Sequence, residues 1–230
     1  MASGSRVREA RRQMSGSGIA GDDGTSVRVL VVDDHAAMRA GLGAVLEAEP
    51  GMVAVGAVAT AREALEAVEQ SPPDIALLDY HLPDEDGLSL CLRLKGKRGP
   101  PRVVIYSAFA DASLALAAVI AGADGIVSKS ARPEELCEAI RNVAEGRAMM
   151  PALVPETMEE SASRLDADDL PILGMLVHRT PADEIAAALG LTEAWLSARR
   201  WAMLGRLRGQ AARRTRPDRA GHRTPSVGSR

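Results

Sequence analysis

Residues 27–34 read Val-Arg-Val-Leu-Val-Val-Asp-Asp, a nearly continuous apolar run that ends in two carboxylates. Such a run is typical of a strand buried on both faces of a parallel sheet. The apolar residues from Met38 to Leu46 are then spaced as in an amphipathic helix, which we expect to stop at Pro50-Gly51. This stretch therefore predicts the first strand and helix of an α/β domain.

The same alternation of strand and helix continues as far as Gly146. Further strands are predicted at 52–58, 74–78, 102–106 and 125–128, and further helices at 60–71, 86–95, 112–121 and 133–146. Five strands alternating with five helices predict a doubly wound α/β domain with a five-stranded parallel sheet. Right-handed crossovers place the functional crevice of such a domain at the carboxyl ends of its strands.

The remaining residues differ in character from this domain. Only short helical patterns follow it, which predicts a second, small all-α domain. We expect a disordered tail at 1–26, the α/β domain at 27–147, a linker at 148–163, the all-α domain at 164–209 and a basic disordered tail at 210–230.

The composition excludes several classes of protein. The chain has 230 residues, 46% of them hydrophobic and 26% charged, as in ordinary globular proteins. Its two cysteines, Cys91 and Cys137, are too few for a disulfide framework or a cysteine-rich zinc site, and we expect both to be buried. No apolar run reaches the ~20 residues of a membrane span, so we expect a cytoplasmic protein without membrane association. Aromatic residues make up only 2%, which argues against base-stacking surfaces.

Five polar side chains are expected to meet at the carboxyl edge of the sheet. Asp33 and Asp34 follow the first strand, and Asp79 follows the third. Carboxylates this close repel one another, and a bound cation such as Mg²⁺ relieves that repulsion. Ser107 and Lys129 end the fourth and fifth strands, where a hydroxyl and an ammonium suit a transferred phosphoryl group.

Four separate motifs resemble the receiver domain of two-component response regulators, whose fold is flavodoxin-like. They are residues 31–35, 77–87, 106–108 and 122–129. The resemblance implies that Asp79 is phosphorylated by a sensor histidine kinase or a small phosphodonor. It also implies that Mg²⁺ is bound by Asp34, Asp79 and the backbone carbonyl of His81, with Asp33 acting mainly through water, and that Ser107 and Lys129 bind the phosphoryl group. Receivers usually carry an aromatic switch residue three positions before the lysine, where this chain has Ile126.

The second domain resembles the LuxR-type helix-turn-helix of the NarL/FixJ class, on residues 183–192. The resemblance implies binding to DNA, with candidate contacts from Thr192, Trp195, Ser197, Arg199, Arg200 and Arg206. From Arg199 to the end there are ten arginines and one acidic residue, Asp218, which favours contact with phosphates.

No apolar stripe follows Leu207, although the family often dimerises through a helix there. A homodimer is therefore expected through the last strand and helix of the receiver, near Leu136 and Ile140. The sequence predicts a transcription regulator rather than an enzyme. One alternative is a phosphorylation-gated module whose altered helix-turn-helix docks a partner protein. Another, a haloacid-type phosphatase, lacks its Asp-x-Asp motif because Tyr80 and His81 follow Asp79.

Overall fold

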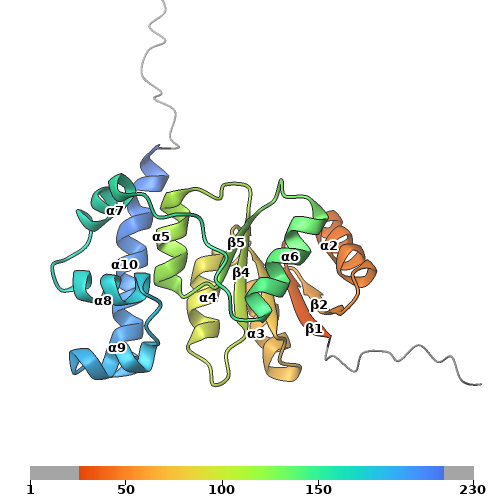
Figure 1. Ribbon diagram of the computed structural model, residues 1–230, viewed down its shortest axis with the longest axis horizontal. Helices are drawn as coiled ribbons and strands as arrows, with labels where there is room; N and C mark the ends of the chain where they lie inside the picture. The colour runs from red at the N-terminus through yellow and green to blue at the C-terminus, as the bar shows by residue number, and fades with distance from the viewer. Residues whose placement is uncertain (1–25, 215–230) are drawn as a thin grey trace, which may run out of the picture.

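A computed structural model of the chain describes residues 26–214 (Figure 1). The tail predicted at 1–26 lies outside this range except for its last residue, and so does the tail predicted at 210–230 beyond Arg214. In chain order the elements are β1 (Val27–Val32), α2 (Ala36–Ala48), β2 (Met52–Val58), α3 (Ala61–Gln70), β3 (Ile75–Asp79), α4 (Gly87–Lys95), β4 (Arg102–Ser107), α5 (Ala112–Ala121), β5 (Gly125–Ser128), α6 (Pro133–Ala144), α7 (Pro155–Ala162), α8 (Asp169–Val177), α9 (Ala182–Leu189) and α10 (Glu193–Arg214).

The five strands form one parallel sheet in the order β2-β1-β3-β4-β5. This is the doubly wound arrangement predicted from the sequence, and the strand bounds agree with the prediction to within one residue. The order reverses between β1 and β3, and this is where a doubly wound sheet has its crevice.

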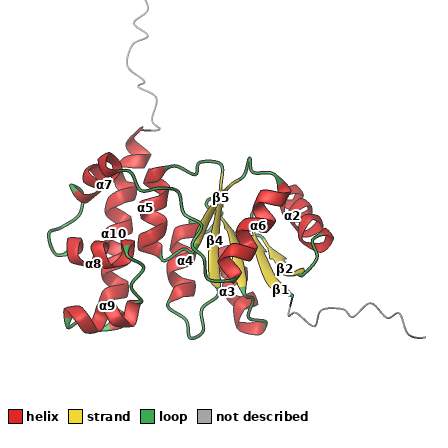
Figure 2. Cartoon of the chain, viewed as in Figure 1, coloured by secondary structure: helices red, strands yellow, loops and turns green. Residues whose placement is uncertain are grey.

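Helices cover both faces of the sheet (Figure 2). Helices α2 and α6 pack on one face through a core of aliphatic residues that includes Leu46 and Ile140. Helices α3, α4 and α5 cover the other face. Leu136 and Ile140 therefore point into the core, 2% and 0% exposed, which contradicts their prediction as part of a dimer surface. The apolar stripe of α6 that suggested such a surface is used within the chain itself.

Four helices, α7 to α10, lie beside α4 and α5 rather than apart from them (Figure 1). Helix α7 falls inside the predicted linker, where Pro155 starts the helix and Ser161 is buried. Helix α10 continues to Arg214, past the domain end predicted at residue 209. The residues after Gly209 are strong helix formers, so the helix continues although it has no apolar stripe there.

Helix α5 is enclosed between the sheet and the C-terminal helices. All of its residues from Ala115 to Ala121 are buried. One hydrophobic core extends from the sheet through α4 and α5 to Ile172, Leu196 and Leu204 of the C-terminal region. A helix that is apolar on all sides is typical of such a position, which explains the uninterrupted apolar run of α5. None of the described helices is both long enough and apolar enough to cross a membrane.

Candidate functional site

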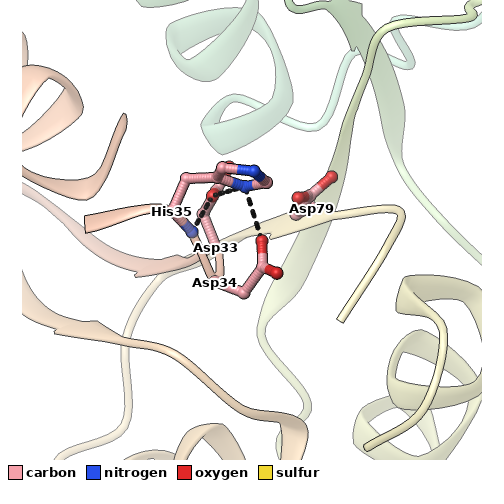
Figure 3. A group of neighbouring side chains, drawn as sticks. All are labelled: Asp33, Asp34, His35 and Asp79. Carbon is pink, nitrogen blue, oxygen red and sulfur yellow. Dashed lines mark hydrogen bonds and ion pairs between the residues drawn. The ribbon is translucent and has the colours of Figure 1, made fainter. Parts of the chain in front are cut away.

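Two acidic residues lie at adjacent strand ends in the crevice of the sheet. Asp33 directly follows β1, Asp79 ends β3, and the register of the two strands pairs Val32 with Leu78. Both carboxylates are buried, with Asp33 1% and Asp79 4% exposed, while Asp34 faces solvent more openly. The parallel sheet therefore brings together the carboxylates that the sequence predicted to converge (Figure 3).

Lys129 connects these two buried carboxylates. Its Nζ lies 2.8 Å from Asp33 Oδ2 and 2.8 Å from Asp79 Oδ2. The burial of Lys129 acts to lower its pKa, but hydrogen bonds to Asp33 and Asp79 and their charges outweigh that effect and raise the pKa. Lys129 is held there because its backbone N–H donates to the carbonyl of Ser107 on the neighbouring strand over 2.8 Å. One ammonium thus offsets part of the negative charge at the site.

The carboxylates form a group suited to a divalent cation. One ligand atom from each of Asp33, Asp34, His35 and Asp79 lies within 4.8 Å of all the others. Three carboxylates and one ammonium leave about two negative charges, which a divalent ion balances, and carboxylate oxygens are the donors that Mg²⁺ prefers. These residues fit the metal that the sequence predicted.

His35 is a member of this group that the sequence analysis missed. Its Nδ1 lies 2.6 Å from Asp34 Oδ1, and its backbone N–H donates to Asp33 Oδ1 over 2.8 Å (Figure 3). The only signal was its position directly after the two aspartates. His81, predicted to offer its carbonyl, lies close by, since its N–H donates to Asp79 Oδ1 over 3.3 Å.

Ser107 ends β4 next to Asp79 and is also buried. Its Oγ accepts a hydrogen bond from the backbone N–H of Phe109 over 3.2 Å. Phe109 itself is 72% exposed, whereas Ile126, at the position of the usual aromatic switch residue, is buried in the core. The ring of Tyr106 lies below Lys129, with its centroid 5.7 Å from Nζ.

The loop after Asp79 is held tightly against the start of α4. A Cβ on Gly87 would lie 2.3 Å from the backbone oxygen of Asp79, so only glycine permits this approach. Asp86 caps α4 by accepting hydrogen bonds from the backbone N–H groups of Leu88 and Ser89, each over 3.0 Å. The backbone of Asp79 is therefore in direct contact with the first turn of α4.

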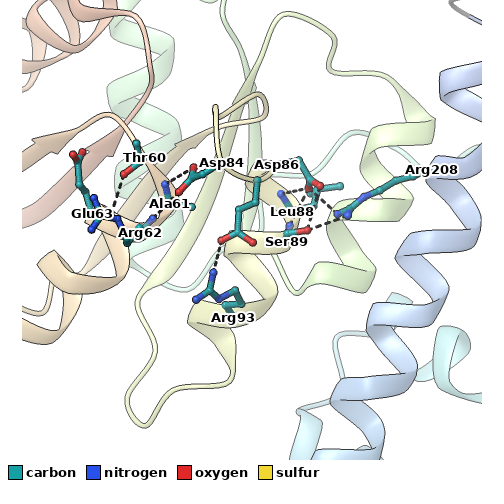
Figure 4. Close-up of polar contacts among 11 residues, drawn as sticks. Thr60, Ala61, Arg62, Glu63, Asp84, Asp86, Leu88, Ser89, Arg93 and Arg208 are labelled. Carbon is teal, nitrogen blue, oxygen red and sulfur yellow. Dashed lines mark hydrogen bonds and ion pairs between the residues drawn. The ribbon is translucent and has the colours of Figure 1, made fainter.

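The same loop is joined to the C-terminal region by Arg208 of α10 (Figure 4). Nη2 of Arg208 donates to Asp86 Oδ1 over 2.7 Å, and Nη1 donates to Ser89 Oγ over 3.0 Å. Nε of Arg208 is buried and has no hydrogen-bond partner among the described residues. The sequence analysis treated Arg208 as part of a basic surface and did not predict this contact.

Two of the arginines predicted to contact DNA are paired within the C-terminal region. Arg199 and Arg206 both form ion pairs with Asp166 and with Asp169, which is fully buried. The carboxylate of Asp169 thus lies between two guanidinium groups. These contacts stabilise the helical region and leave neither arginine free in this conformation.

A third predicted DNA contact, Arg200, points into the receiver and is 7% exposed. Its Nε donates to the backbone oxygen of Ile120 in α5 over 2.7 Å. Ser197 and Trp201, on the same face of α10, line a cavity shared with Leu92 of α4. Arg200 is thus covered by the receiver and Ser197 is partly buried, which the prediction of DNA contacts from these two residues did not anticipate, whereas Trp201 is still 37% exposed.

Thr192 and Trp195 lie at the exposed start of α10. Thr192 Oγ1 accepts a hydrogen bond from the backbone N–H of Trp195 over 3.1 Å, and α9 ends just before at the left-handed Gly190. The indole of Trp195 is exposed. The Cζ of Arg199 lies over this ring, 5.7 Å from the ring centroid. Helices α9 and α10 are therefore joined by a short turn, as the helix-turn-helix resemblance implied.

Comparison with known proteins follows the same division of the chain. A family model described as response regulator receiver domain matches residues 29–141. The transcriptional regulatory protein MctR of Rhizobium johnstonii is 31% identical over 173 residues, which cover 73% of this chain and 81% of MctR. A solved two-component response regulator of the LuxR family from Aurantimonas sp. superposes with a TM-score of 0.54 at 34% identity, covering 60% of this chain and 99% of that one.

One relative is similar over a shorter span. The DNA-binding transcriptional activator DevR/DosR of Mycobacterium tuberculosis is 36% identical over 124 residues. That alignment covers 54% of this chain and 57% of the relative.

Proposed function

Since the chain belongs to the NarL/FixJ class of two-component response regulators, we propose that it is phosphorylated on Asp79 and regulates transcription through DNA binding by its C-terminal helices. The receiver spans residues 27–147 in this proposal, and the output region begins at residue 164. The observation that carries the proposal is the pair of buried carboxylates, Asp33 and Asp79, bridged by the ammonium of Lys129.

The chemistry proposed at Asp79 is transfer of a phosphoryl group. A carboxylate oxygen of Asp79 attacks the phosphorus, and the bond from phosphorus to the donor breaks as the new one forms. The donor is a phosphorylated histidine of a sensor kinase or a small acyl phosphate. Lys129 is positioned to pair with the arriving phosphoryl oxygens, and Ser107 to donate a hydrogen bond to one of them. Asp33, Asp34, Asp79 and the carbonyl of His81 would hold Mg²⁺, which neutralises charge on those oxygens.

Phosphorylation also changes the contacts of the loop that carries Asp79. The new group adds negative charge and acceptor oxygens next to Ser107, whose Oγ now accepts from the N–H of Phe109. When Ser107 turns towards the phosphoryl group, that hydrogen bond breaks and the loop before α5 moves. Because α5 packs against α10, this motion loosens the contact between receiver and output region.

Binding to DNA requires such a loosening. One face of α10, including Arg200 and Trp201, is turned towards the receiver. A helix covered in this way cannot enter a major groove of about 12 Å width. We therefore propose that the structure is the resting state, that phosphorylation releases α10, and that Ser197 and Arg200 then become available to DNA together with the already exposed Thr192 and Trp195.

The test combines phosphorylation with DNA capture. Wild-type protein incubated with acetyl phosphate and Mg²⁺ should be labelled on a phosphoprotein gel, and the matched variant Asp79→Asn should not. Equal labelling of the two would contradict the assignment of Asp79. Sequencing of genomic fragments retained by the phosphorylated protein should then reveal enriched sites.

A second function is favoured by one observation. The indole of Trp195 is exposed, while the arginines Arg199 and Arg206 are paired with acidic residues. An exposed tryptophan beside arginines that are already paired, Arg199 and Arg206, suits a phosphorylation-gated surface that binds a protein. Failure of the phosphorylated protein to enrich any genomic fragment over bulk DNA would support this alternative.

A further inference from the structure

A cavity of about 400 Å³ lies between the receiver and the C-terminal helices, at the end of the sheet opposite to Asp79. Its wall comes from the starts of β4 and β5, the ends of α5 and α6, and the loop between α8 and α9. The charged side chains that line it are five cations and one carboxylate: Lys95, Arg102, Arg147, Arg179, Arg200 and Asp124. We call it the interdomain cavity.

The one carboxylate that lines the cavity, that of Asp124, already accepts hydrogen bonds from neighbouring groups. Asp124 Oδ2 accepts hydrogen bonds from Lys95 Nζ and from the backbone N–H of Val103, each over 2.7 Å. Arg102 lies only at the limit of an ion pair, 4.0 Å from Asp124 Oδ1. Arg147 is paired outside the cavity wall, with Glu145. Asp124 therefore cannot neutralise the remaining cations.

Arg200 is a buried cation without an acidic partner. Its hydrogen-bond partner is a neutral backbone carbonyl, that of Ile120, and it forms no ion pair with any described residue. The guanidinium lies against Gly122, where a Cβ would stand 2.6 Å from Nη2. Burial lowers the pKa of Arg200, which reflects the cost of a charge in this position. A buried charge is ordinarily paired, so a counter-ion is expected here.

Arg179 also lines the cavity and is a second cation without an ion-pair partner among the described residues. It lies at the end of α8 in the left-handed backbone conformation, with a φ of 59°, and is exposed. Its side chain makes no hydrogen bond or ion pair with any residue that the structure describes. Arg179 and Arg200 belong to the output region, whereas Arg102 belongs to the receiver, so an anion held by all three would join the two parts of the chain.

We propose that the interdomain cavity binds a small molecule that carries a diphosphate group. Three cations, Arg102, Arg179 and Arg200, lack a full carboxylate partner, and a diphosphate carries about the matching charge. The arginine fork pairs well with phosphate oxygens. The volume lies within the range of small-ligand sites, about 300 to 1,000 Å³. A bound diphosphate bridges receiver and output region and stabilises the closed arrangement.

The proposal is tested by titrating the full chain with inorganic pyrophosphate in a calorimeter, without Mg²⁺ and at constant ionic strength set with NaCl. The wild type should bind one pyrophosphate per chain. Loss of one charge-assisted contact in Arg179→Gln or Arg102→Gln should weaken binding by about tenfold. Arg62→Gln, an exposed arginine on α3 paired with Glu66, should bind as the wild type does.

The variant Asp79→Asn separates this cavity from the phosphorylation site, which also accepts phosphate oxygens. Pyrophosphate binding should be unchanged in Asp79→Asn. Loss of binding there would place the pyrophosphate at the phosphorylation site and overturn the proposal. Wild-type affinity in both Arg179→Gln and Arg102→Gln would overturn it as well, and so would the absence of binding up to about 1 mM pyrophosphate.

Discussion

Arg208 of α10 donates a hydrogen bond over 2.7 Å to Asp86, the residue that caps α4 and lies on the loop leaving Asp79. The output helix is thereby tied to the loop that follows the proposed phosphorylation site, Asp79. The contact is partly buried, with side-chain exposures of 28% for Arg208 and 27% for Asp86. Among the described residues, it is one of the few hydrogen-bonded links between α10 and the receiver, beside that of Arg200 to Ile120, so its removal should shift the balance between closed and open forms.

We expect Arg208→Gln to favour the open form without phosphorylation. We expect the free energy of opening to fall by only about 1 kcal/mol. The lost hydrogen bonds favour opening, but the variant also removes the buried, unpartnered Nε of Arg208, which destabilised the closed form. Fluorescence anisotropy with bulk DNA should show a several-fold rise in affinity of the unphosphorylated variant. Loss of a cation alone would lower DNA affinity, so a rise reports opening. The DNA affinity of Arg208→Lys should lie between those of Arg208→Gln and the wild type, and Arg62→Gln should have the DNA affinity of the wild type. A lower DNA affinity of Arg208→Gln would contradict the account.

The carboxylate of Asp169 should be important for the stability of the helical region. It is 0% exposed and pairs with Arg199 and Arg206. Asp169→Asn leaves two guanidinium groups without their buried partner, and breaking such a pair costs about 3 to 5 kcal/mol of unfolding free energy. The matched variant Asp166→Asn removes the more exposed carboxylate of the same cluster, 53% exposed, and should cost about 1 kcal/mol or less. Urea unfolding measures both, and equal losses would be inconsistent with the burial described here.

The contribution of Lys129 to the free energy of unfolding should be lost at alkaline pH. Hydrogen bonds and charges from Asp33 and Asp79 raise its pKa above the ordinary 10.5 despite burial. A group whose pKa is raised on folding contributes stability below its ordinary pKa, and that contribution is lost as the pH rises through the folded value. Lys129→Met should therefore lower the free energy of unfolding by about 2 kcal/mol at pH 8, and the difference from wild type should narrow above pH 10.5.

Urea titrations at several pH values, without Mg²⁺, provide this comparison. Lys97→Met removes a lysine paired with Glu69 on the surface and serves as the control. A difference between wild type and Lys129→Met that stays constant through the alkaline range would exclude the ion pair as its cause.

Tryptophan emission offers a direct view of α10, because both tryptophans of the chain lie on this helix. Trp201 lines a cavity shared with Leu65 and Leu92 of the receiver. In the variant Trp195→Phe, we expect acetyl phosphate with Mg²⁺ to shift the emission of Trp201 to longer wavelength as the indole leaves the receiver. The double variant Trp195→Phe with Asp79→Asn should show no shift under the same conditions.

The sequence was most informative about the receiver. Buried strands such as Val27–Val32 are short apolar runs closed by polar residues, so their bounds follow from local pattern. The convergence of Asp33 and Asp79 follows from strand order alone. Both cysteines are buried as expected, and burial raises the pKa of Cys91 to about 12.

The sequence was less informative about how the two parts of the chain meet. The arginines of α10 formed a basic pattern that suggested a DNA surface, yet their partners lie far away along the chain, such as Asp86 for Arg208 and Ile120 for Arg200. Periodicity within one helix does not identify which distant carboxylate or carbonyl a long side chain reaches. The apolar run of α5 was the one local sign that a further layer covers that helix.

The central claim is that phosphorylation of Asp79 releases α10 from α5, and hydrogen exchange of the backbone amides in α5 tests it most directly. These amides lie under α10 in the resting state, with residues from Ala115 to Ala121 buried. After treatment with acetyl phosphate and Mg²⁺, we predict faster exchange in peptides covering Ala112–Ala121 of the wild type and no change in Asp79→Asn. Unchanged protection of α5 in protein shown by mass to be phosphorylated would contradict the account.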